Sequence, residues 1–106
     1  MVLSMNKRTK AVAIPTEVKK AVHERDEGCC IFCGTPVSVF FANVHYIPRS
    51  KGGLGIEENI GTACLKCHSW LDQSYMRNKM MESFRRRLDR FYPDFKDEDR
   101  VYRKGL

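Results

Sequence analysis

The sequence predicts a single α+β domain held together by a metal site, and three observations support this. Residues 37–47, VSVFFANVHYI, alternate β-branched and aromatic residues in a way that is typical of short strands. Two other segments carry apolar residues at helical spacing. The chain has 106 residues and five cysteines, and domains of this size often need a disulfide or a metal for stability. There is no internal repeat and no sign of a second domain.

The N-terminal part is basic, and residues 1–14 are predicted to form a flexible arm because they lack apolar periodicity. A helix is expected to begin at Pro15, since proline is favoured at helix starts, and to end at Gly28. Val18 and Val22 lie on one face of this helix and should face the core.

The central part of the chain is expected to contain the strands. CCIFCGTP, residues 29–36, is predicted to be a tight cysteine turn, and residues 37–47 are predicted to form two short strands. Residues 51–59, KGGLGIEEN, carry three glycines and are typical of a loop. IGTACLKCHSWLDQ, residues 60–73, then enters a second helix near Cys67.

The C-terminal part is predicted to be a long helix followed by a charged tail. Apolar residues at positions 76, 80, 84, 88 and 91 follow helical spacing as far as Pro93. The predicted organisation is a basic arm over residues 1–14, one domain with its C-terminal helix over residues 15–92, and a charged tail over residues 93–106. Val101 and Tyr102 are the expected anchors of this tail.

The composition limits the expected binding partners and the expected cellular compartment of the protein. The net charge is +6, which fits a polyanion such as nucleic acid, although an ordinary basic surface would also explain it. No apolar run is long enough to span a bilayer, and the start is too polar for a signal peptide. The protein is therefore predicted to be cytoplasmic, where cysteines bind metals more often than they form disulfides.

The cysteines form two pairs with the spacing of zinc ligands. Cys30 and Cys33 are separated by two residues, as are Cys64 and Cys67. A CxxC turn directs both thiolates to one point, so two such turns complete a tetrahedral zinc site. Disulfides or free core thiols are the alternatives. Four thiolates would close the metal to substrate, which predicts a structural zinc, and Cys29 is interpreted as a thiol outside the site.

Two histidines and an asparagine lie around these pairs. His45 precedes Pro-Arg-Ser-Lys-Gly-Gly, His68 directly follows Cys67, and Asn59 lies between them. A shared zinc would draw the two histidines together. In this order and spacing, over roughly residues 23–72, the sequence resembles the HNH endonucleases of the zinc-stapled ββα-metal type, with His45, Asn59 and His68 at the three name-giving positions.

The resemblance implies a ββα-metal core with flanking helices and a DNA endonuclease that hydrolyses phosphodiester bonds. His45 would deprotonate water, His68 would bind a catalytic divalent cation such as Mg²⁺ or Mn²⁺, and Asn59 would orient the loop or touch the metal. A neutral histidine suits the role of general base. Taken singly, His45 could be a core histidine, His68 a spare zinc ligand, and Asn59 a turn or cap residue.

One position departs from the family pattern. The residue before the general-base histidine is usually aspartate or histidine and binds the cation, but here it is Val44. Asp72 is the nearest substitute, because it lies four residues after His68 and would share its face of a helix. The alternative is that Asp72 is a solvated helix residue, and loss of the ligand could leave weak activity or none.

The DNA is expected to be bound through its phosphates, so affinity should fall steeply with salt. A resemblance to small phage and prophage HNH proteins implies a link to DNA packaging and to phage terminase or other packaging proteins as partners. The alternatives are a non-catalytic zinc-ribbon DNA-binding module and a packaging adaptor with a degenerate nuclease site. The residues expected to contact DNA are Arg49, Lys51, Lys66, Arg85 and Arg86.

Overall fold

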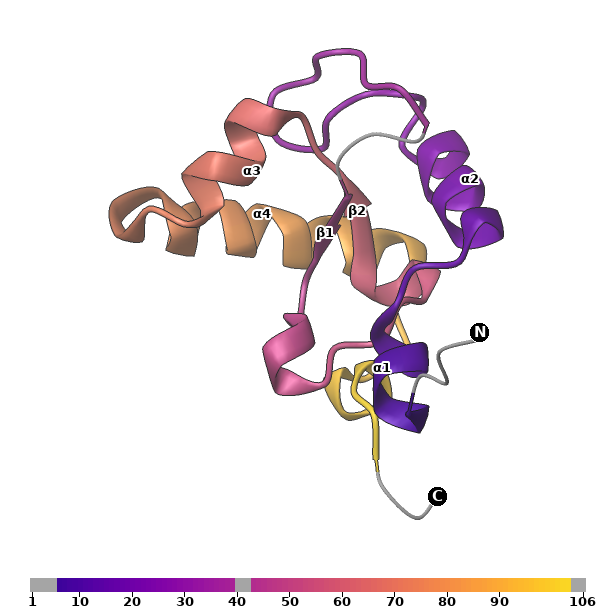
Figure 1. Cartoon of the computed structure of the whole chain (residues 1–106). Helices are drawn as coiled ribbons and strands as arrows, with labels where there is room; N and C mark the ends of the chain where they lie inside the picture. Colours follow the sequence, from indigo (N-terminus) through magenta and orange to yellow (C-terminus); the bar gives the residue numbers. More distant parts are fainter. Residues whose placement is uncertain (1–5, 40–42, 104–106) are drawn as a thin grey trace.

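The computed structural model describes residues 6–39 and 43–103, and Figure 1 shows their arrangement. Short 3-10 turns at Arg49–Lys51, Glu57–Asn59 and Asp97–Arg100 lie in the connecting segments. No helix among the described residues is both long enough and apolar enough to cross a membrane. The helices and strands are α1 (Lys7–Val12), α2 (Thr16–Arg25), β1 (Asn43–His45), β2 (Ile60–Thr62), α3 (Leu65–Leu71) and α4 (Ser74–Phe91).

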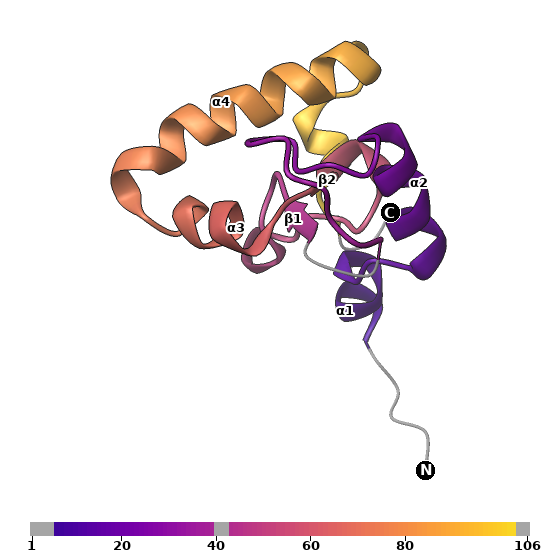
Figure 2. The ribbon, with the colours of Figure 1, turned by 90° about the horizontal axis from the view of Figure 1, so that it is seen from above.

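The centre of the fold is an antiparallel pair of strands followed by a helix. In the register of β1 and β2, Val44 pairs with Gly61 and His45 pairs with Ile60. The chain then enters α3, so the order is ββα within an α+β fold, as predicted. Both views show α2 and α3 on opposite sides of the strands, and Figure 1 shows α4 crossing behind the strands (Figures 1 and 2).

The strands differ from the prediction in one respect. Two strands were expected within residues 37–47, but β1 is the only strand among the described residues of that segment, and residues 40–42 lie outside the described part. The partner strand is β2, from a segment that was interpreted as leading into a helix. Each strand has only three residues, and a pattern of period two cannot be recognised over that length.

The core lies between the strands and α4. Met80, Phe84 and Leu88 are buried, which confirms the predicted helical spacing along this part of α4. Gly61 allows the close approach, because a Cβ atom there would lie 3.0 Å from the Phe84 ring. Val44 is also buried in this cluster, and therefore the strand that carries His45 is fixed by packing.

The described parts of the predicted arm and tail, residues 6–14 and 93–103, are more ordered than the sequence indicates. The flexible arm was expected to include Lys7–Val12, but these residues form α1, and Asn6 caps this helix by accepting a hydrogen bond from the Thr9 N–H. In the described part of the charged tail, Arg100 is fully buried, and its Nε donates to the Glu58 carbonyl at 2.6 Å. Both segments are held largely by polar contacts, which leave no apolar periodicity in the sequence.

Candidate active site and metal centre

The four predicted cysteine ligands come together in one cluster. The Sγ atoms of Cys30, Cys33, Cys64 and Cys67 all lie within 4.8 Å of one another. The Sγ atoms of Cys33 and Cys64 are 3.6 Å apart, far longer than the roughly 2 Å of a disulfide. Tetrahedral zinc with Zn–S bonds of about 2.3 Å would separate its sulfurs by about 3.8 Å. The cluster therefore has the dimensions of a zinc site.

Local hydrogen bonds to the sulfur atoms favour the thiolate form, which is the form that binds a cation. The Phe32 N–H donates to Cys30 Sγ and the Cys67 N–H donates to Cys64 Sγ, each at 3.4 Å. A hydrogen bond with the Thr35 side chain, more than any other cause, lowers the pKa of Cys33 to about 6. Burial raises the pKa of the Cys67 thiol, so a bound cation is needed to hold that side chain as a thiolate.

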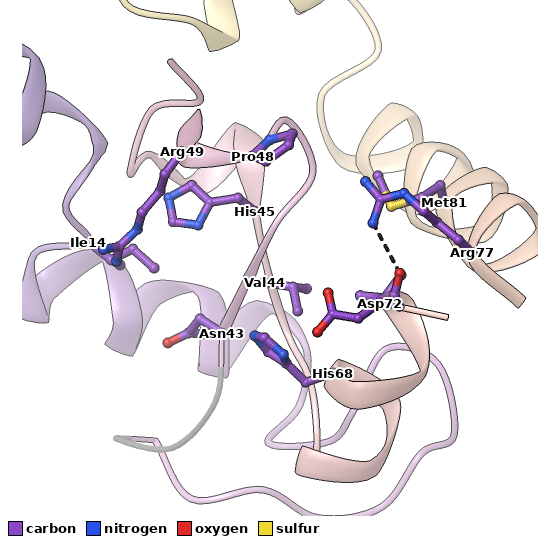
Figure 3. A pocket seen from close by; sticks show the side chains of 11 residues that line it. Ile14, Asn43, Val44, His45, Pro48, Arg49, His68, Asp72, Arg77 and Met81 are labelled. Atoms are coloured by element: carbon purple, nitrogen blue, oxygen red, sulfur yellow. Dashed lines mark hydrogen bonds between the residues drawn. The ribbon is translucent and has the colours of Figure 1, made fainter. Parts of the chain in front are cut away.

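A pocket of about 330 Å³ is lined by residues of β1 and α3 (Figure 3). His45 from β1 and His68 from α3 both line it, although they are far apart in the sequence. The prediction that the two cysteine turns bring the histidines to one place is therefore confirmed. Asp72, Arg49 and Arg77 also line the pocket.

His45 is held in one tautomer. Its Nε2 atom lies 3.0 Å from the Val12 carbonyl oxygen, which can only accept a hydrogen bond, so Nε2 carries the proton. In the neutral ring the Nδ1 atom then has a free lone pair. Burial is the main cause that lowers the pKa of His45, and the positive charge of Arg49 lowers it further. The imidazole is therefore neutral at pH 7.

Asn59 does not line the pocket. It is fully buried, and its Oδ1 accepts a hydrogen bond from the Ile47 N–H at 2.9 Å. Its Nδ2 donates to the carbonyls of Ile47 and Leu54 at 3.1 and 2.9 Å. The amide thus ties the two ends of the loop after β1 to each other. This placement fits the loop-orienting role and leaves no donor atom of Asn59 facing the pocket.

The cation ligands expected at the pocket are few. Figure 3 shows His68 and Asp72 projecting from α3, with Val44 beside them. Within residues 6–39 and 43–103, the cysteine cluster is the one group of three or more His, Cys, Asp or Glu side chains that could hold a metal. With valine at position 44, His68 and Asp72 are the expected cation ligands that line the pocket.

The predicted DNA contacts are not equivalent in the structure. Arg49, Lys51, Lys66 and Arg86 are exposed, and the Lys66 ammonium lies 4.9 Å from the centre of the Trp70 ring.

Arg85 is the exception, because its guanidinium is bound to other side chains of the protein. It donates to Asp97 at 2.8 Å, to Asp89 at 3.2 Å and to the Tyr46 hydroxyl at 3.2 Å. It is therefore less available to a phosphate than its neighbour Arg86.

Two groups at the pocket could not be found by reading the sequence. Arg77 was not among the predicted site residues, because it is separated from His68 by the break between α3 and α4. Its Nη1 donates to the Leu71 carbonyl at 3.1 Å. The Val12 carbonyl is a backbone group of a segment that carried no motif. Every residue has a backbone carbonyl, so the sequence does not indicate which carbonyl contacts His45.

Comparison with known proteins agrees with this geometry. The sequence model of the family described as HNH endonuclease matches residues 30–71. A search of the curated proteins and a search of the solved structures each found no match. The matched segment begins at the first ligand of the cysteine cluster and includes β1, β2 and α3 with both pocket histidines. Residues 30–71 are therefore similar in sequence to the HNH endonuclease family.

Proposed function

We propose that the protein is a divalent-metal-dependent DNA endonuclease in which His45 is the general base. The observation that carries this proposal is the state of His45, which is neutral, protonated on Nε2, and placed in a pocket with His68 and Asp72. The similarity to the HNH endonuclease family gives the proposal its reaction class, phosphodiester hydrolysis.

In this mechanism His45 accepts a proton from water through Nδ1. The Val12 carbonyl accepts the hydrogen bond from Nε2 and stabilises the imidazolium that results. Because β1 is fixed by the burial of Val44, the ring is supported by a rigid element. Arg49 and Arg77 line the same pocket and supply positive charge for the phosphate.

His68 and Asp72 are the residues that would hold a catalytic cation. Divalent cations such as Mg²⁺ are often bound by one or two carboxylates, with water and substrate phosphate oxygens completing the shell, so a site with one carboxylate and one imidazole is adequate but weak. When bound, the cation would neutralise charge on the phosphate and on the leaving oxygen. The cysteine cluster, with four thiolates, would have no open position for substrate.

The direct test is cleavage of supercoiled plasmid by zinc-loaded protein, with and without added Mg²⁺ or Mn²⁺. Nicked or linear product that depends on the added cation supports the proposal. Retardation of the DNA without any cleavage, at every concentration of either cation, would contradict it and favour a DNA-binding module or an adaptor with a degenerate site.

Replacing Val44 by aspartate is expected to lower the Mg²⁺ concentration needed for cleavage. A carboxylate at position 44 would join His68 and Asp72 as a third donor, and Mg²⁺ prefers oxygen ligands. In the parent protein, which depends on an imidazole, Mn²⁺ should support cleavage at lower concentration than Mg²⁺ does. The measurement is a titration of the cleavage rate against each cation.

Val44→Asn is the matched control, because asparagine has the size of aspartate without its charge. Val44 is 4% exposed, so a polar residue there costs stability in both variants, and melting curves separate that cost from metal binding. Asp72→Ala should raise the cation concentration needed in the parent. Superimposable titrations for the parent, Val44→Asp and Asp72→Ala would show that neither position touches the cation.

Arg86 and Arg85 give a matched pair for the DNA surface. Removing one phosphate contact should reduce the slope of log affinity against log salt by about 0.9. We expect this for Arg86→Ala, because that side chain is exposed. Arg85→Ala should instead lower the melting temperature and leave the slope unchanged, since it removes the contacts with Asp97 and Tyr46. Binding measured across a salt series decides between them, and the reverse pattern would contradict this assignment.

A further inference from the structure

We propose that α1, which lies outside the segment similar to HNH endonucleases, is a positioning element of the active site: it docks on the loop after β1 and holds His45 in the tautomer that leaves Nδ1 free. The inference rests on the proposed role of His45 as general base. It assigns a role in the site to a segment that ends well before the matched residues 30–71.

The contact between α1 and His45 comes from the end of the helix. Val12 is the last residue of α1, and the carbonyls of a helix's last turn have no partner inside the helix. The Val12 carbonyl is therefore free to accept the hydrogen bond from His45 Nε2. The Val12 side chain is 8% exposed, so packing fixes the residue that bears this carbonyl.

Three further contacts fix α1 on the loop that follows β1. The Arg8 guanidinium donates to the carbonyls of Arg49 and Ser50, both at 3.2 Å. The Gly55 N–H donates to the Ala11 carbonyl at 3.0 Å. A Cβ atom at Gly55 would lie 1.9 Å from the Ala13 carbonyl oxygen, so the two segments are in direct backbone contact. Figure 1 shows α1 and this loop at the same end of the molecule.

Through these contacts α1 holds the Val12 carbonyl beside His45. The first loop residue that α1 contacts is Arg49, which lies four residues after His45 and lines the pocket. If α1 leaves the loop, His45 loses the acceptor that fixes its proton on Nε2. The ring is then free to take the other tautomer or to rotate, and a base displaced by about 1 Å costs roughly a hundredfold in rate.

The test uses Arg8, because its side chain anchors α1 without touching the pocket. Arg8→Ala in the full chain is expected to lower plasmid cleavage roughly ten- to a hundredfold. Arg8→Lys should recover part of the loss, since an ammonium can still donate to one of the two carbonyls. Lys7→Ala is the control for charge: it removes one positive charge from the same helix, at an exposed position.

The second readout is the tautomer of His45, which does not depend on cleavage. Long-range ¹H–¹⁵N correlation spectra of the zinc-loaded protein at about pH 8, where the ring is neutral, report which nitrogen carries the proton. We expect the Nε2–H form in the parent and in Lys7→Ala, and a mixture of forms in Arg8→Ala. Gly55→Ala, which pushes on the Ala13 carbonyl from the loop side, should give the same mixture.

The outcomes separate this inference from the proposed function. If the parent does not cleave DNA but Arg8→Ala changes the tautomer, the nuclease proposal fails and the positioning role of α1 stands. If Arg8→Ala and Gly55→Ala keep the parent's tautomer and cleavage rate, α1 does not position His45, whatever the activity of the parent. A lower melting temperature with an unchanged tautomer would likewise overturn the inference, because it would show that α1 contributes to stability and does not position His45.

Discussion

His45→Ala is expected to lower DNA cleavage by roughly a hundred- to ten-thousand-fold, the range that a positioned general base contributes. The other residues that line the pocket cannot replace it, because Arg49 and Arg77 are cations and His68 and Asp72 are the expected cation ligands. DNA affinity should hardly change, since it depends on phosphate contacts. Rates of plasmid cleavage and binding isotherms for both proteins test this.

The structure adds a control to this experiment. Alanine removes the base and also the contact with the Val12 carbonyl, whereas His45→Gln keeps an N–H donor that can reach this carbonyl. Both variants should be inactive, and the glutamine variant should retain more of the parent's stability. His23→Gln, at the histidine whose Nε2 lies 2.6 Å from the Val37 carbonyl outside the pocket, should cleave like the parent. Cleavage by His45→Gln within a few-fold of the parent would identify another base.

Much of the fold could be predicted because its main signals are spacings. The CxxC pairs and the helical repeat of Met80, Phe84 and Leu88 are visible in residue identity and reappear in the structure. β2 was missed because three residues are too few to show a period. α1 was missed because its six residues are held by a cap and by backbone contacts.

The candidate site also has features that the sequence predicted and features that it could not predict. The meeting of His45 and His68 followed from the cysteine pairs, because a shared metal joins the turns that precede both histidines. The partner of His45 could not be predicted, since it is a backbone carbonyl. The ion pair between Arg85 and Asp97 could not be predicted either, because Arg85 lies within α4 and Asp97 lies in the turn that follows this helix. The link to DNA packaging and to terminase proteins stays a prediction from resemblance.

Cys67→Ser is expected to abolish stable metal binding and to unfold most of the protein. Cys67 is 3% exposed and belongs to the core cluster, so its serine replacement would bury a hydroxyl and leave three thiolates. Structural zinc sites in small domains contribute about 10–16 kcal/mol of apparent binding free energy. The net stability of a domain is only about 5–15 kcal/mol. Loss of the metal is therefore enough to remove the folded state.

Cys29→Ser is the matched control, because Cys29 adjoins Cys30 in the chain but is not one of the four clustered cysteines. It should keep one zinc per chain and the parent's melting curve, as measured by metal analysis and by circular dichroism on heating. Full zinc content and an unchanged melting curve in Cys67→Ser would show that the cluster is not the metal site.

A third variant, Cys33→Ser, tests how the metal centre and the pocket are connected. Cys64 caps α3 and Cys67 lies in its first turn, so the metal would fix the start of the helix that carries His68 and ends at Asp72, its C-cap. Cys33→Ser removes an exposed ligand from the opposite turn and should leave a weaker metal site on a folded chain. If that protein keeps its secondary structure but loses cleavage until zinc is added in excess, then the zinc positions the pocket as well as stabilising the fold.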